Sequence, residues 1–211
     1  SHGDLVTAPW LPSHIGYTAS GWDSPLSNIT SNRTITAQYR ANTYRIVFDR
    51  NADDATGDMP SMDMTYASAK NLTANSYSRT GYTWNGWNTQ ADGRGTSYRN
   101  RQSVSNLVTA DNGSITLYAQ WAPNTYTVKF VDGHDGTTIK SAQLEYGSAI
   151  TAPNAPEHAG YTATGWNKTP GNVTGDETFT MSYRANTYTV RFDKNNQAAT
   201  GSMSDQQMAY G

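Results

Sequence analysis

Apolar and polar residues alternate along several short segments of the chain, which is the pattern of half-buried β-strands. The segment 126–130 reads Tyr-Thr-Val-Lys-Phe. Successive side chains of a strand point to opposite sides, so Tyr126, Val128 and Phe130 share the face that can be buried. Segment 178–183 alternates in the same way. The pattern therefore predicts short strands with one apolar face.

Turn residues and prolines separate the alternating segments. Segment 132–136 is Asp-Gly-His-Asp-Gly, which predicts a turn leading into a return strand over 138–146 and hence a hairpin. Segment 150–160 contains two prolines and several alanines, which allows a helical turn or two but no long helix. A third strand is expected over 161–166 and a fourth over 178–183. We expect a β-rich α+β fold built from small modules.

Two motifs recur and show that the chain is an array. Gly-Tyr-Thr-x-x-Gly-Trp occurs at 16–22, 81–87 and 160–166, and Tyr-x-[Ile/Val]-x-Phe occurs at 44–48, 126–130 and 188–192. A shift of 144 residues aligns 3–67 with 147–211 without a gap and gives 31 identities in 65 positions. The second motif starts 82 and then 62 residues apart, so a long repeat alternates with a short one.

The connections between the predicted modules are short. Arg-Ala-Asn-Thr occurs at 40–43 and again at 184–187, with Ala-Pro-Asn-Thr at 122–125. Four residues span at most about 14 Å, so we expect successive modules to be held end to end in an elongated array. A module of this size buries only about 60% of its unfolded surface, so each is expected to depend on the neighbouring repeats of the same chain.

The repeat can be divided in two ways, and we favour the first. Counted from the Tyr-x-[Ile/Val]-x-Phe strand, the domains are a partial short repeat at 3–43, complete repeats at 44–125 and 126–187, and the first hairpin of a further long repeat at 188–211. Counted after Tyr-Gly, they are three whole modules at 3–67, 68–146 and 147–211. The first division places Phe48 in one core with Trp87, the second with Trp22. The first also suggests that 188–211 of one molecule completes 3–43 of another by head-to-tail self-association.

This order of motifs resembles the Listeria-Bacteroides repeat, also described as the internalin B repeat-like family. The resemblance implies tandem β-grasp modules, ubiquitin-like or SUMO-like, without catalytic residues of their own. It also implies a large secreted or wall-attached bacterial surface protein, a setting in which such modules sometimes accompany extracellular glycosidases. The chain departs from the family at Ala19 and Ala163, where a large aromatic such as Trp84 is preferred, and in the insertion 88–105.

Charge and composition exclude several other classes. The chain has 15 Lys and Arg against 17 Asp and Glu, and its basic residues are scattered, so no nucleic-acid partner is expected. Apolar runs such as 46–48 are far shorter than the roughly 18 residues needed to cross a bilayer, so no membrane insertion is expected. The absence of cysteine excludes disulfides, thiolate zinc sites and thiol catalysis.

No catalytic residue, cofactor site or metal site is predicted. A glycosidase needs two carboxylates about 5 to 10 Å apart in a cleft, whereas the acids at 53–54 and 176–177 lie in turn-like segments of small modules. His14 and His158 occupy the same position in two copies, which favours a shared structural role over metal binding.

The aromatic residues leave one candidate contact and two functions. The Tyr and Trp of each Gly-Tyr-Thr-x-x-Gly-Trp motif are interpreted as core, because a bulge at the second glycine would bring both rings to one face. Trp10 aligns with Asn154, so the fold does not require an aromatic there, and Trp10 is the candidate ligand contact. We expect an extracellular, cell-surface or wall-attached stalk without enzyme activity. The alternative is an adhesive module that binds a glycan or host protein through exposed aromatics.

Overall fold

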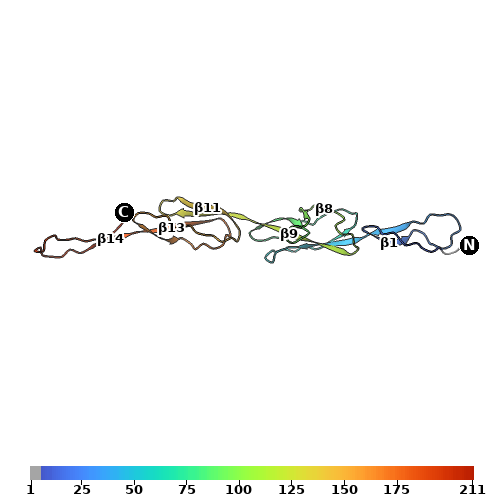
Figure 1. Ribbon diagram of the computed structural model, residues 1–211, viewed down its shortest axis with the longest axis horizontal. Coiled ribbons are helices and arrows are strands. Elements are labelled where there is room, and N and C mark those ends of the chain that lie inside the picture. Colours follow the sequence, from blue (N-terminus) through green and yellow to red (C-terminus); the bar gives the residue numbers. More distant parts are fainter. Residues whose placement is uncertain (1–5) are drawn as a thin grey trace. The chain divides into compact units, whose positions relative to one another are not determined.

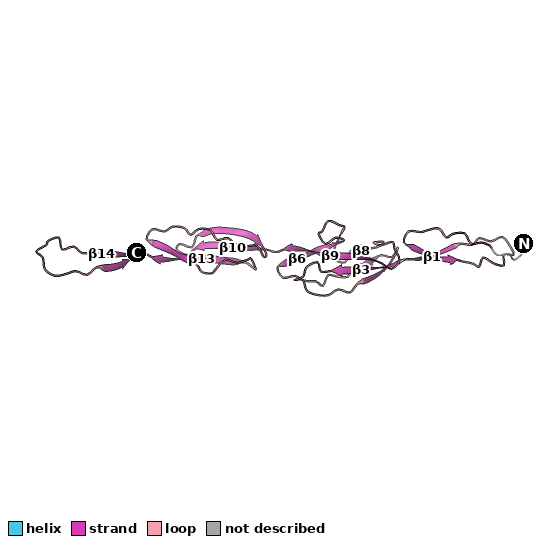
Figure 2. Ribbon diagram, turned by 60° about the horizontal axis from the view of Figure 1, so that its bottom comes forward, coloured by secondary structure: helices cyan, strands magenta, loops and turns pink. Residues whose placement is uncertain are grey.

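The computed structural model describes residues 6–211, which form strands and loops without a helix (Figures 1 and 2). The expectation of a β-rich protein is confirmed, whereas the α part of the α+β expectation was wrong. Segment 150–160, where a helical turn was allowed, is irregular from 150 to 158. Pro153 and Pro156 lack an N–H and push the preceding residue toward extended backbone, which prevents even a short helix.

The chain divides into two compact units, Ser1–Ala122 and Pro123–Gly211. Residues 3–5 of the expected first repeat lie outside the described residues. The strands of the first unit are β1 (Tyr17–Trp22), β2 (Ala37–Ala41), β3 (Thr43–Asp49), β4 (Met62–Thr65), β5 (Lys70–Asn71), β6 (Tyr82–Asn88), β7 (Ser97–Tyr98), β8 (Ser103–Val104) and β9 (Gly113–Pro123). β1 and β2 form one antiparallel pair and β5 and β8 another, while the remaining strands form a five-stranded sheet in the order β4-β3-β9-β6-β7.

At the centre of the five-stranded sheet, β3 and β9 run parallel. Ile46 lies opposite Ile115 and Phe48 opposite Leu117, although about 70 residues separate these strands in the sequence. On its other edge β3 pairs with β4 in an antiparallel hairpin. The side chains of β3 alternate strictly between exposed and buried, as the period of two predicts.

The second unit repeats this arrangement on a smaller scale. Its strands are β10 (Thr125–Asp132), β11 (Thr138–Glu145), β12 (Tyr161–Trp166), β13 (Glu177–Ala185), β14 (Thr187–Val190) and β15 (Gln206–Ala209). The first four form one sheet in the order β11-β10-β13-β12, with β10 and β13 parallel, and the last two form a separate hairpin. In both units the strand that carries the Tyr-x-[Ile/Val]-x-Phe motif thus pairs in parallel with a later strand, β3 with β9 and β10 with β13.

The predicted bulge within the Gly-Tyr-Thr-x-x-Gly-Trp motif is observed in the β1–β2 and β12–β13 pairs. In the β1–β2 pair the register shifts between Ala19 and Gly21, and in the β12–β13 pair it shifts between Ala163 and Gly165. Both glycines have a positive φ, which L side chains rarely adopt. The extra residue changes which face the following tryptophan joins.

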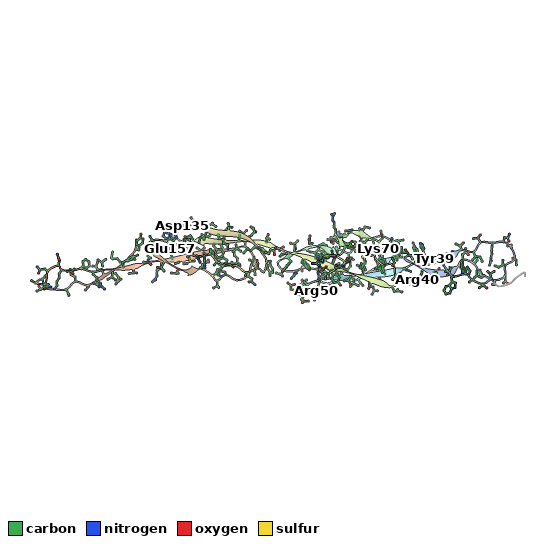
Figure 3. All side chains as sticks on the ribbon, viewed as in Figure 1. Tyr39, Arg40, Arg50, Lys70, Asp135 and Glu157 are labelled. Carbon is green, nitrogen blue, oxygen red and sulfur yellow. The ribbon has the colours of Figure 1, made fainter. Side chains whose placement is uncertain are left out.

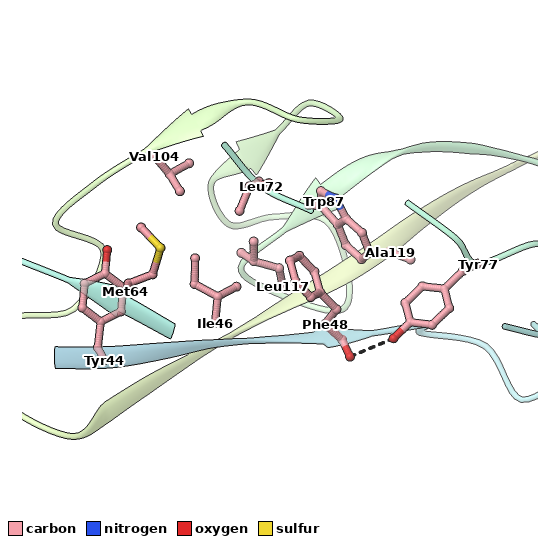
Figure 4. Close-up of a cluster of buried hydrophobic side chains, with 10 residues drawn as sticks. All are labelled: Tyr44, Ile46, Phe48, Met64, Leu72, Tyr77, Trp87, Val104, Leu117 and Ala119. Atoms are coloured by element: carbon pink, nitrogen blue, oxygen red, sulfur yellow. Dashed lines mark hydrogen bonds between the residues drawn. The ribbon is translucent and has the colours of Figure 1, made fainter. Parts of the chain in front are cut away.

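Ten side chains form the core of the first unit (Figure 4): Tyr44, Ile46, Phe48, Met64, Leu72, Tyr77, Trp87, Val104, Leu117 and Ala119. Trp87 is fully buried, with its ring centroid 4.9 Å from that of Phe48. The Tyr77 hydroxyl donates a hydrogen bond of 3.0 Å to the Phe48 carbonyl. The core therefore joins the first hairpin of this repeat to the Trp of its own glycine motif.

The core of the second unit is smaller and follows the same plan. Phe130 stacks on Phe179 at 5.0 Å between ring centroids and meets the edge of Trp166 at 4.9 Å. Val128, Ile150 and Val173 complete the buried cluster.

Candidate functional site: the joint between repeats

The connections at 40–43 and 184–187 each contain an asparagine that hydrogen-bonds to both the preceding and the following segment. In the first unit the Asn42 N–H donates to the Gly16 carbonyl at 2.9 Å, and the Asn42 carbonyl accepts from the Tyr66 N–H at 2.8 Å. Gly16 immediately precedes β1, and Tyr66 immediately follows β4. We call this set of contacts the Asn joint.

The side chain of Asn42 adds two further bonds. Its Oδ1 accepts from the Thr18 hydroxyl at 2.6 Å, and its Nδ2 donates to the Thr109 carbonyl at 2.7 Å. Asn42 is buried, so these polar atoms would be costly without partners. Thr18 lies on β1 and Thr109 precedes β9, so one amide ties both segments to the connection between β2 and β3.

Two features of the joint require glycine at position 16: the backbone conformation there and the Tyr66 ring packed against it. Gly16 has φ +77, and a Cβ placed on it would lie 2.3 Å from the Tyr66 ring. The Tyr66 ring covers this glycine and meets the Tyr17 ring edge-on at 5.6 Å between centroids. The joint is therefore packed as well as hydrogen-bonded.

The second unit repeats the joint 144 residues later. The Asn186 N–H donates to the Gly160 carbonyl and the Asn186 carbonyl accepts from the Tyr210 N–H, both at 2.8 Å. The Thr162 hydroxyl donates to Asn186 Oδ1. Tyr210 meets Tyr161 edge-on at 5.6 Å, as Tyr66 meets Tyr17 in the first joint. The third connection has the matching bond, from the Tyr146 N–H to the carbonyl of its asparagine, at 2.8 Å.

An ion pair reinforces the first joint. Arg40, next to Tyr39 on β2 (Figure 3), donates two hydrogen bonds to the Asp111 carboxylate, one on each oxygen. Asp111 Oδ1 also accepts from the Thr43 N–H at 3.0 Å. The side-chain hydrogen bond of Arg40, followed by that Thr43 bond, lowers the pKa of Asp111 from 3.8 to about 2.

This shift predicts how the joint responds to acid. Because the folded-state pKa of Asp111 is depressed, its contribution is present above about pH 4 and is lost as the pH falls through about 2. We expect the amide chemical shift of Thr43, measured by NMR, to titrate with a midpoint near 2. The Asp111→Asn variant should abolish this transition, and a midpoint near 3.8 in the unmodified chain would contradict the assignment.

The candidate ligand contact, Trp10, is 98% exposed. It precedes β1 in a stretch without regular structure.

The paired histidine positions have structural contacts. His158 Nε2 lies 2.7 Å from Asp132 Oδ2, its ring lies 4.2 Å from that of His134, and His14 stacks on Tyr17 at 4.4 Å. Burial by itself raises the pKa of Asp132. Hydrogen bonds from the backbone N–H of His134 and from the His158 side chain lower it, and together they outweigh burial, so the pKa of Asp132 lies below its ordinary value. Within residues 6–211 no three His, Asp or Glu side chains converge as a metal site would require.

A cleft of about 760 Å³ lies along β3 and β4 and reaches 112–114. Of the described residues that line it, only Asp63 carries a carboxylate, and Arg45 Nε lies 3.1 Å from Asp63 Oδ1. This lining does not supply the two carboxylates of a glycosidase.

Two aromatic residues that the sequence placed in the core belong to the joint. Tyr17 and Tyr161 are half-buried and pack on Tyr66 and Tyr210, the tyrosines of the next hairpin. The role of the asparagine was also missed. Its signal was present in the sequence, since Asn occupies the same place in all three connections, at 42, 124 and 186.

Repeated β-modules linked by short joints define the chain as a tandem-repeat β-protein. The Listeria-Bacteroides repeat domain matches residues 44–120 and 126–187, which is more than half of the chain. The chain therefore belongs to the Listeria-Bacteroides repeat family.

Two relatives come from Evansella cellulosilytica. One, named "Putative Gly-rich membrane protein", is 30% identical over 220 residues and covers 90% of this chain and 25% of the relative. The other, named "Putative membrane protein", is 25% identical over 175 residues and covers 77% of this chain and 24% of the relative. The chain thus spans about a quarter of the length of these relatives. Among residues 6–211 there is no helix of the length and apolarity needed to cross a bilayer.

Proposed function

We propose that the chain is a non-catalytic spacer, or stalk, of a bacterial surface protein. The observation that carries this proposal is the Asn joint, which recurs with the same partners at Asn42 and Asn186. A connection with a buried, fully hydrogen-bonded residue resists bending because bending would leave polar groups without partners. A series of such joints would hold modules end to end and give reach.

The finer fold and the location belong to the same proposal. A central parallel pair of first and last strands, flanked by a hairpin and a third strand, supports a β-grasp module in which an irregular segment replaces the helix. In this view 44–125 and 126–187 are the physical modules, since each contains one of the two cores. An extracellular, cell-surface or wall-attached location is supported by the family and by relatives whose names describe membrane proteins.

Small-angle X-ray scattering tests the spacer. A compact body of 211 residues has a radius of gyration of about 17 Å, and we expect the chain at high dilution to exceed this value clearly. Four glycines inserted after Asn42 should broaden the distance distribution, because they separate the partners of the first joint. A radius near the compact value would overturn the spacer.

An adhesive role is the second candidate, and the full exposure of Trp10 favours it. Exposed aromatic rings stack on sugar faces and anchor protein contacts, so the partner would be a glycan or a host protein. A glycan array comparing the chain with the Trp10→Ala variant separates the two functions. Binding that the variant loses supports adhesion, and absence of binding leaves the spacer.

A further inference from the structure

The chain enters and leaves each main sheet on two neighbouring strands. In the first unit β3 begins at Thr43 and β9 ends at Pro123, and the two strands run parallel over six register pairs. In the second unit β10 begins at Thr125 and β13 ends at Ala185, and these strands are parallel over five register pairs. Each unit is thus spanned by a parallel ladder that lies between its point of entry and its point of exit.

This arrangement decides how a pulling force acts on the ladder. Tension along the chain pulls the start of β3 one way and the end of β9 the other way, because the strands are parallel and are held at opposite ends. The strands must then slide past each other, so the hydrogen bonds of the ladder resist the force together. In an antiparallel hairpin such as β3–β4 both free ends lie at the same side, and tension would break the bonds one after another.

We propose that these parallel ladders make each unit resistant to mechanical pulling, so that the chain transmits force in addition to giving reach. This inference rests on the proposed spacer function, since a stalk is exposed to any force that acts on the part it holds. It adds a property that reach alone does not require, because strands that peel apart would give the same length.

Further hydrogen bonds fasten both ends of the β3–β9 ladder. At its start the Asn112 N–H donates to the Thr43 carbonyl at 2.7 Å, and the Thr43 N–H donates to Asp111 Oδ1 at 3.0 Å. At its far end Trp121 Nε1 donates to the Arg50 carbonyl at 2.8 Å. Each bond joins segments about 70 residues apart in the sequence, so each must break when β3 slides along β9.

The buried face of the ladder opposes sliding as well. Ile46 and Leu117 are fully buried on neighbouring strands, and Phe48 lies opposite Leu117 (Figure 4). In the second unit Phe130 lies opposite Phe179, and both are buried. A slip of one residue would exchange the buried and the exposed faces of a strand. Sliding must therefore break the core contacts together with the hydrogen bonds.

Single-molecule force spectroscopy on the full chain, with two attachment geometries, tests the proposal. The chain has no cysteine, so a pair of introduced cysteines fixes where the force acts. In the sliding geometry the pair is Thr43→Cys with Pro123→Cys, at the start of β3 and the end of β9. In the peeling geometry the pair is Arg50→Cys with Gln120→Cys, so both attachment points lie at the same end of the same ladder.

We expect the rupture force in the sliding geometry to be at least about twice that in the peeling geometry, because the register pairs must fail together instead of in turn. Rupture should release about 80 residues in one step, which lengthens the chain by roughly 250 Å. Equal forces in the two geometries would overturn the proposal. A radius of gyration above the compact value would still support the spacer in that case, so the two failures are distinguishable.

Two tryptophan variants test the far end of the ladder. Trp121→Phe removes the indole donor to the Arg50 carbonyl and keeps an aromatic ring. Under constant force in the sliding geometry it should shorten the lifetime of the folded unit by about two- to tenfold, the effect of one hydrogen bond. Trp84→Phe is the matched control and should change the lifetime much less, because Trp84 Nε1 has no hydrogen-bond partner among the described residues. Equal lifetimes in the two variants would contradict the role of Trp121.

Discussion

Trp87→Ala is expected to unfold the five-stranded sheet of the first unit. Trp87 is fully buried against Phe48, Tyr77 and Trp84. Truncating a buried tryptophan leaves a cavity and typically costs about 3–5 kcal/mol. A repeat of this size has little stability in reserve. Hydrogen exchange followed by mass spectrometry should show loss of protection along β3 and β9, with the strands of the second unit as the internal reference.

Two matched variants identify the cause. Trp22 holds the same place in its motif but is half-buried, so Trp22→Ala removes less buried apolar surface and should cost much less. Trp87→Phe keeps most of the apolar volume and removes an indole N–H that has no hydrogen-bond partner among the described residues, so it should also be milder. Equal losses in the Trp22 and Trp87 alanine variants would contradict the assignment of Phe48 and Trp87 to one core.

Gly160→Ala is expected to release the β14–β15 hairpin from the second joint. Gly160 has φ +77, and an added Cβ would lie 2.2 Å from Cγ of Tyr210, at the root of the ring. The ring cannot avoid this contact by rotating, so Tyr210 must leave Tyr161. A left-handed non-glycine residue alone costs about 1–3 kcal/mol. We expect the Tyr210 amide, which donates to Asn186, to lose protection by about tenfold or more.

Gly136→Ala separates the two contributions. Gly136 has φ +81, but a Cβ there would meet nothing within 4 Å. The variant therefore carries the backbone strain without the collision, and the Tyr210 amide should keep its protection. A Gly160→Ala variant with an unchanged Tyr210 amide would show that the ring does not hold the hairpin.

The sequence predicted the strands and the bulge on which these variants depend, but it did not predict the contacts of the Asn joint. The repeated motifs placed the strands and the bulge correctly, because alternation and glycine positions act through neighbouring residues. The connections were recognised as short, but the function of Asn42 was not. Its partner Thr109 lies 67 residues away, and the sequence contains no local pattern that links them.

The helical turn was the clearest error in the expected fold. The two prolines and the alanines of segment 150–160 were judged to allow a helical turn or two, whereas Pro153 and Pro156 leave the backbone irregular. The irregular segment still contributes Ile150 to the second core. An apolar side chain at this place is therefore enough to pack against the sheet of the second unit, and a helix is not needed.

The sequence by itself determined the repeat, its alternating lengths, the strands and the family, since each depends on residues close together in the chain. Only the tertiary structure decided which copies of a motif are buried. Trp22 and Trp87 end identical motifs, yet one is half-buried and the other fully buried. Trp87 is fully buried because the parallel pairing of β3 with β9 assembles its core from segments about 70 residues apart, which no local pattern specifies.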